Sequence, residues 1–172
     1  DDRDLLEAAQ THPGKDGCAR MSVAAIRTQV KAILQGVANI GQVHDYDRWE
    51  IDWDDFLVLF KSTIGGTDQI RGWTIHSQSE VSSYPGTNNV GQFEHLFLLR
   101  GYMSLKDASA TEKTFDDLVE AVQSAFLGNY TLNGSAMYAE PPQGVVKEIR
   151  QLSDVIVHYA EIQLRVRERT TF

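Results

Sequence analysis

A strict alternation of apolar and polar side chains near the end of the chain limits the possible folds more than any other feature. The segment is VIVHYAEIQLRVRE, residues 155–168. Successive side chains of a β-strand point to opposite faces of a sheet, so this pattern predicts a long strand with one core face and one wet face. The predicted core side chains are Ile156, His158, Ala160, Ile162, Leu164 and Val166. The predicted solvated side chains are Tyr159, Glu161, Gln163, Arg165 and Arg167.

Two earlier segments supply a pair of antiparallel strands for the same sheet. QIRGWTIHSQSEV (residues 69–81) is rich in β-branched and aromatic residues, and FEHLFLLRGYMSL (residues 93–105) is a long strand-like run. The turn-rich SSYPGTNNVGQ between them predicts a hairpin with an extended tip. Residues 144–152 are a further predicted strand, and Tyr130 to Leu132 a short one.

Helical periodicity appears in two places. Ser22 is a predicted N-cap for a helix that ends near Gly36, and Thr111 is a predicted cap for a second helix that ends at Gly128. The apolar stripe of the second helix is Phe115, Leu118, Val119, Val122 and Phe126. The continuous apolar run in DDFLVLFKSTIGG (residues 54–66) fits a buried strand or a short helix, and we favour the helix.

These elements predict an α+β fold with a largely antiparallel or mixed sheet, two main helices packed on one face, and a long protruding hairpin. A chain of 172 residues with 42% hydrophobic content can bury one core, so residues 21–172 are expected to form a single domain. Residues 1–20 differ in composition and are interpreted as an N-terminal extension.

The charge balance excludes one large class of functions. The 24 acidic residues outnumber the 16 basic ones, and the net charge of −8 disfavours a surface that neutralises nucleic-acid phosphates. The single Cys18 can form neither an internal disulfide nor a cysteine metal cluster, which fits a reducing cytoplasm. No apolar run reaches the roughly 18 residues that span a bilayer, so we expect a soluble protein without a membrane partner.

The motifs of common catalytic sites are missing from the sequence. The five histidines lie at positions 12, 44, 76, 95 and 158, without an HExxH pair, and no GxSxG motif holds a nucleophilic serine. Gly65-Gly66 is followed by TDQI and not by the end of a P-loop. We therefore expect no catalytic residue, no metal and no cofactor, and we interpret His158 as a partly buried imidazole bonded to a neighbour.

The stretch VHDYDRW, residues 43–49, concentrates charged and aromatic side chains. The structural interpretation is that Arg48 pairs with Asp45 or Asp47, while Tyr46 and either Trp49 or Trp53 anchor the segment onto the sheet. Tyr, Trp and Arg are also enriched among binding hot spots, so the stretch is a candidate interface.

The order of these segments resembles the small tail terminator and tail completion proteins of long-tailed bacteriophages and prophages. The resemblance covers Ser22 to Glu168, and residues 1–20 depart from the usual short start. The segments that carry it are the helix from Ser22, VHDYDRW, IRGWTIHSQS, FEHLFLLRGYMSLKDAS leading into TFDDLVEAVQSAF, and VIVHYAEIQLRVRE.

The resemblance implies a structural virion protein without catalytic residues, at the junction of tail and neck. It implies a homohexameric ring that caps the tail tube, joins a neck or head-completion protein, and lets DNA pass without sequence-specific binding. The expected interface residues, which include the hairpin tip, are Tyr46, Arg48, Trp49, Tyr84, Asn88 and Asn89. Carboxylates facing the lumen would keep the duplex mobile, and the candidates are Asp45, Asp47, Asp54, Asp55, Asp116 and Asp117.

Two alternatives remain open on the sequence. The nearer one is a head–tail connector or other neck protein of the same particle. The more distant one is a small cytosolic enzyme or ligand-binding α+β domain that uses His44, His76 or His95 and has a deep pocket.

Overall fold

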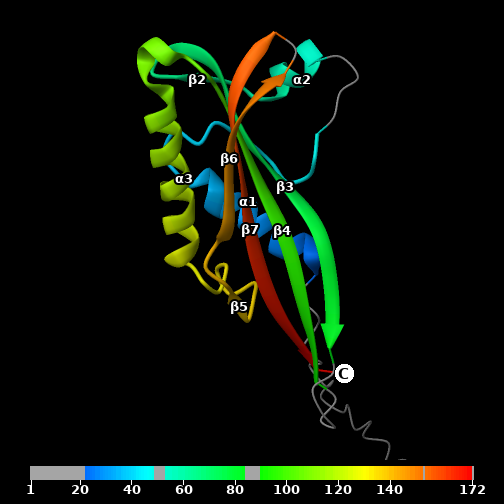
Figure 1. Ribbon diagram of the computed structural model, residues 1–172. Helices are drawn as coiled ribbons and strands as arrows, with labels where there is room; N and C mark the ends of the chain where they lie inside the picture. The colour runs from blue at the N-terminus through cyan, green and yellow to red at the C-terminus, as the bar shows by residue number, and fades with distance from the viewer. Residues whose placement is uncertain (1–21, 49–52, 84–89, 153, 172) are drawn as a thin grey trace, which may run out of the picture.

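A computed structural model describes residues 22–48, 53–83, 90–152 and 154–171 of the chain (Figure 1). The helices are α1 (Val23–Gln35), α2 (Trp53–Leu59) and α3 (Thr111–Leu127), with a short 3-10 helix at Asp107–Ser109. The strands are β1 (Gln42–His44), β2 (Lys61–Ile64), β3 (Thr67–Ser83), β4 (Val90–Ser104), β5 (Tyr138–Ala139), β6 (Gln143–Leu152) and β7 (Val155–Thr171).

The strands form one mixed seven-stranded sheet, which confirms the predicted α+β class. Its central order is β1-β3-β4-β7-β5, while β2 pairs with β3 and β6 pairs with β7. Only β1 runs parallel to its neighbour among the described pairs, and the others are antiparallel. The predicted hairpin is the long β3–β4 pair, and its tip lies outside the described residues.

The main core lies between the sheet and the two long helices. α1 and α3 both cover one side of the sheet, which is called the helix face here (Figure 1). The Ser22 hydroxyl accepts a hydrogen bond from the Ala25 amide and caps α1 as predicted. The buried apolar side chains of α1 and α3 are Ile26, Val30, Leu34, Phe115, Leu118, Val119, Val122 and Phe126. They pack on sheet residues that include Ile75, Phe97, Leu99, Ile162 and Leu164.

Trp73 is the largest side chain in this core, and a glycine on the next strand makes room for it. Trp73 is 0% exposed and lies directly opposite Gly101 in the β3–β4 register. A Cβ atom on Gly101 would lie 2.7 Å from the indole Cζ2 atom, closer than such atoms can pack. The absent side chain therefore lets the indole lie across β4.

The other side of the sheet, called the open face here, carries a smaller aromatic cluster. Phe56 of α2, Phe60, Tyr102 and Tyr159 meet there, with ring centroids 5.0 Å apart for Phe60 and Tyr102 and 5.4 Å for Tyr102 and Tyr159. Tyr159 is 2% exposed, so its predicted solvated position is wrong, because Tyr102 and the Arg150 guanidinium, 3.4 Å from its ring centroid, cover it. Ile156, predicted in the core, is 47% exposed because it lies at the end of the β6–β7 hairpin.

Three predictions about helices and strands need correction. The helix favoured for residues 54–66 covers only the part up to Leu59, and β2 follows it. The N-cap of α3 is Ala110, with a φ of 48°, and not Thr111. The Thr111 hydroxyl instead accepts a hydrogen bond from the Lys106 amide at 2.8 Å. The short strand predicted at Tyr130 to Leu132 is a turn, and the strand of this region is β5.

Three long strands continue beyond the two main helices. The far parts of β3, β4 and β7 form an arm, here residues 78–83, 90–95 and 165–171, at the lower end of Figure 1. β3 and β7 have 17 residues each, so each spans about 55 Å at roughly 3.3 Å per residue. The arm thus projects away from the helix-covered part of the sheet.

Candidate functional site

A chain of charged side chains crosses the open face and holds the segment that contains Asp47. The Asp47 carboxylate lies 2.6 Å from His76 Nδ1 and 3.2 Å from Arg100 Nη1. Arg100 Nε donates to Glu161 Oε2 at 3.0 Å, and the Tyr159 hydroxyl donates to the same oxygen at 2.9 Å. These five residues, called the Arg100 network here, come from β3, β4, β7 and the segment after β1.

The electrostatics of the Arg100 network favour its paired state. Burial alone would raise the pKa of Glu161, but hydrogen bonds from Arg100 and Tyr159 outweigh burial and leave that pKa below its usual value. Burial, together with the bond to Glu161, raises the pKa of Tyr159 well above the usual range. The phenol therefore stays protonated and acts as a donor.

This geometry is suited to holding a loop rather than to nucleophilic catalysis. His76 and Asp47 lie as close as the base and orienting acid of a catalytic triad. The Asp47 carboxylate, however, also forms an ion pair with the Arg100 guanidinium. The hydroxyl of the network belongs to Tyr159, whose raised pKa makes it a poor nucleophile. We therefore interpret the network as a set of ion pairs and hydrogen bonds that holds the Asp47 segment against the open face.

The stretch VHDYDRW has different contacts from those predicted. Asp45 Oδ1 lies 3.3 Å from Lys31 Nζ, and Asp47 belongs to the Arg100 network, so the predicted pairing of Arg48 with either aspartate is wrong. The Arg48 guanidinium instead lies 5.5 Å from the ring centroid of Tyr46. Tyr46 is 51% exposed, which is compatible with an interface role. Trp49 lies outside the described residues.

The acidic candidates are divided between the two faces. Asp54 and Asp55 are exposed on α2, which packs on the open face, whereas Asp116 and Asp117 lie on α3 of the helix face. Asp116 pairs with Lys147 Nζ at 2.6 Å. The six aspartates therefore do not form one acidic surface of a single chain. Of the interface candidates, Tyr84, Asn88 and Asn89 lie outside the described residues.

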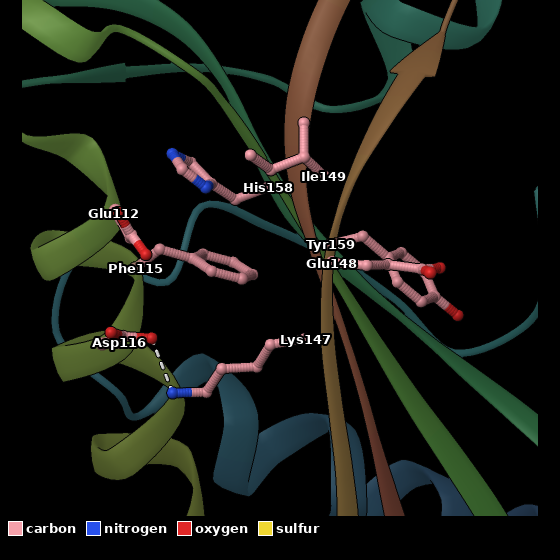
Figure 2. Close-up of a pocket in the computed structure, with 8 residues that line it drawn as sticks. All are labelled: Glu112, Phe115, Asp116, Lys147, Glu148, Ile149, His158 and Tyr159. Carbon is pink, nitrogen blue, oxygen red and sulfur yellow. Dashed lines mark hydrogen bonds and ion pairs between the residues drawn. The ribbon is translucent and has the colours of Figure 1, made fainter.

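A groove lies between α3 and strands β6 and β7, where it encloses about 270 Å³ (Figure 2). Figure 2 shows Phe115 beneath the His158 ring, with Ile149 beside it and the Asp116–Lys147 pair across the opening. His158 is 6% exposed, its ring stacks on Phe115 at 5.6 Å, and its Nε2 atom lies 3.0 Å from Thr111 Oγ1. The predicted interpretation of His158 as a buried imidazole bonded to a neighbour fits these contacts.

The burial of His158 leads us to expect that the folded protein loses stability on mild acidification. Burial lowers its pKa below the usual 6.5, against the opposing effect of Glu112 and Asp116, so the folded protein holds the neutral ring. The unfolded chain binds the proton more readily, and folding stability therefore falls as the pH drops below about 6.5. Urea unfolding at pH 7.5 and pH 5.5 should show a smaller loss of stability in His158→Gln than in the wild type. An equal loss in both proteins would contradict this assignment.

The other described histidines lie at separate places. His44 Nε2 contacts the Leu59 carbonyl at 2.9 Å, His76 belongs to the Arg100 network, and His95 Nε2 lies 3.0 Å from Glu168 Oε2. Within the described residues, no group of three or more His, Cys, Asp or Glu side chains is placed to hold a metal ion. These histidines therefore do not converge on one site.

The structure shows an exposed apolar patch that the sequence interpretation missed. Tyr130, Met137 and Tyr138 are 58%, 46% and 39% exposed, and the two tyrosine rings lie 6.3 Å apart. The Met137 amide donates to the Arg167 carbonyl at the edge of β7, which places the patch beside the arm. Glycine and proline mark this region as a loop, but the signal for an interface was its aromatic and methionine content.

Comparisons with known proteins give no family assignment: no family model matches the chain, and no curated protein matches it. In the described residues, no helix is both long and apolar enough to cross a membrane.

Proposed function

We propose that the chain is a structural virion protein that caps a phage tail tube as a ring, ends tube polymerisation and joins the tube to the neck. The observation that carries this proposal is the three-stranded arm beyond the helices. An arm of this length reaches a neighbouring chain, and its exposed β3 segment (residues 78–83) and the adjacent Tyr130–Tyr138 patch offer contacts of the type found in interfaces. The net charge of −8 is compatible with a channel in which DNA slides.

The decisive experiment adds the full chain to tail-tube subunits while they polymerise. We expect tubes of limited length with a ring on one end by electron microscopy, and a hexamer mass by native mass spectrometry. Tube growth that continues unchanged would contradict the proposal. A chain that binds only head-side subunits would instead favour the head–tail connector.

The Tyr130–Tyr138 patch supplies a matched pair of variants. Tyr138→Glu places a charge in the patch and should abolish capping, whereas Val58→Glu places the same charge on α2, where Val58 is 64% exposed. Both residues are exposed, so both variants should fold, as circular dichroism can verify. Equal capping by both variants would exclude the patch from the ring contact.

The groove of Figure 2 favours one other function, the binding of a small ligand. Its buried imidazole and the aromatic ring of Phe115 are features of ligand sites, although about 270 Å³ is at the lower limit of their usual volume. A monomer that ignores tail tubes and is stabilised by a small molecule would support this second candidate.

A further inference from the structure

Within the part of the chain that the structure describes, the outer edge of β6 is open to a second strand. β6 pairs with β7 on one side, and no described strand pairs with its other side. Nearly all of β6 is exposed, including Val146 at 49% and Ile149 at 64%. An exposed strand edge with apolar side chains is a ready template for pairing with another chain.

The residues along this edge are complementary to themselves. Residues 146–152 read VKEIRQL, in which Ile149 is flanked by Glu148 on one side and Arg150 on the other. In an antiparallel pair of two β6 strands centred on Ile149, Glu148 of each copy lies opposite Arg150 of the other. The same register places Val146 opposite Leu152, and Ile149 opposite its own copy. Opposite charges and apolar pairs at facing positions stabilise an antiparallel ladder.

The charges also favour this register over the two registers that are shifted by two residues. A shift by two residues keeps every side chain on its own face of the sheet. One such shift places Arg150 opposite Arg150, and the other places Glu148 opposite Glu148, both of which are like-charge pairs. Only the register centred on Ile149 avoids them among these three.

We propose that two copies of this chain pair through their β6 edges, antiparallel and centred on Ile149, in a two-fold symmetric dimer. Such a contact uses the same surface on both copies, as a two-fold axis requires. Glu148 and Arg150 already contact each other within one chain, and the Arg150 guanidinium lies 3.4 Å above the Tyr159 ring. The side chains are thus held on the open face, where two copies bring four alternating charges together. This contact goes beyond the proposed ring and does not depend on it.

The dimer covers an edge that no described strand occupies. Ile149 of each copy would lie on the helix face beside the groove of Figure 2, where it meets its counterpart. Lys147, which also points to this face, is neutralised by Asp116 and does not oppose the approach. The pairing therefore adds apolar contact on the helix face and ion pairs on the open face.

A charge swap in the full chain tests the proposal by its mass in a dilution series. Glu148→Arg alone and Arg150→Glu alone each create two like-charge pairs, and each should raise the dimer dissociation constant at least about tenfold. The double variant E148R/R150E restores both opposite-charge pairs with reversed polarity and should return the wild-type constant. Glu120→Arg, on the exposed side of α3, makes the same charge change as Glu148→Arg away from β6 and should have no effect.

In the absence of tail-tube subunits, the expected wild-type species has twice the 19.3 kDa chain mass. A wild-type monomer at all concentrations would overturn the proposal, and so would a double variant that dimerises no better than the single ones. A hexamer whose mass is unchanged in all β6 variants would also overturn it, while leaving the proposed ring intact. If the protein forms β6 dimers but does not cap tubes, the dimer proposal stands and the proposed ring is contradicted.

Disulfide trapping gives an independent readout of the register. Facing residues of an antiparallel pair have Cα atoms about 4.5–5.5 Å apart, which is within the range of a disulfide. In a Cys18→Ser background, Ile149→Cys should cross-link into a covalent dimer under mild oxidation. Val81→Cys, at another exposed strand position, is the control. Cross-linking that is no faster at position 149 than at position 81 would contradict this register.

Discussion

Replacing Trp73 with alanine is expected to lower the free energy of unfolding by about 3–5 kcal/mol, the usual cost of truncating a large buried aromatic side chain. Trp73 is 0% exposed and packs in the main core between α1 and the sheet. Its indole N–H has no hydrogen-bond partner within the described residues, so the expected loss comes from packing. Gly101 directly beneath it has no side chain that could move into the cavity, which places the expected loss in the upper part of the range.

Chemical denaturation followed by far-ultraviolet circular dichroism measures this loss. Val81→Ala is the matched control, because Val81 is 61% exposed on β3, the same strand. The control should change stability by less than about 0.5 kcal/mol. A loss below about 2 kcal/mol for Trp73→Ala would show that the surrounding core collapses around the cavity.

The sequence predicts those parts of the fold whose periodicity is set by the main core. The apolar stripe from Phe115 to Phe126 faces the core between the helices and the sheet. The apolar positions of the alternation in β7 face the same core. The prediction fails at Tyr159, because its cover on the open face comes from Tyr102 of β4 and Arg150 of β6, which are not neighbours of Tyr159 in the sequence. Alternation within one strand reports which side is more apolar, but it does not report a distant segment that packs on the other side.

The candidate site shows the same limit for polar residues. The sequence marks Asp47 as chemically notable and predicts its partner within VHDYDRW, whereas its partners are His76 on β3 and Arg100 on β4. Sequence spacing identifies pairs along a helix or across a turn, and the registers of three strands determine this network. The Thr111–His158 contact has the same origin, since it joins α3 to β7. The charge pattern around Ile149, by contrast, lies within one short segment of the sequence. It predicts self-pairing as soon as β6 is known to be an edge strand.

Replacing Arg100 with methionine is expected to lower stability by about 1.5–3 kcal/mol at neutral pH, the range for hydrogen bonds to charged groups. The substitution keeps much of the side-chain length and removes the one cation shared by Asp47 and Glu161. Among the described residues, the two partly buried carboxylates then keep His76 and Tyr159 as their close partners. Urea unfolding at pH 7 measures the loss, and Arg165→Met is the matched control. Arg165 pairs with Glu94 on the exposed arm, where the expected loss is below about 1 kcal/mol.

The pH dependence of the same variant separates a charge effect from a packing effect. Glu161 has a lowered pKa in the folded protein, so its contribution to stability is present above its usual value of 4.5 and is lost as the pH falls through the folded value. Without Arg100 the lowering largely disappears, and the variant should lose less stability than the wild type as the pH falls below 4.5. The two proteins should therefore differ most at neutral pH and converge in acid. A difference in stability that stays constant from neutral pH to below pH 4.5 would show that Arg100 acts through packing. The ion pairs of the Arg100 network would then not be what holds Asp47 on the open face.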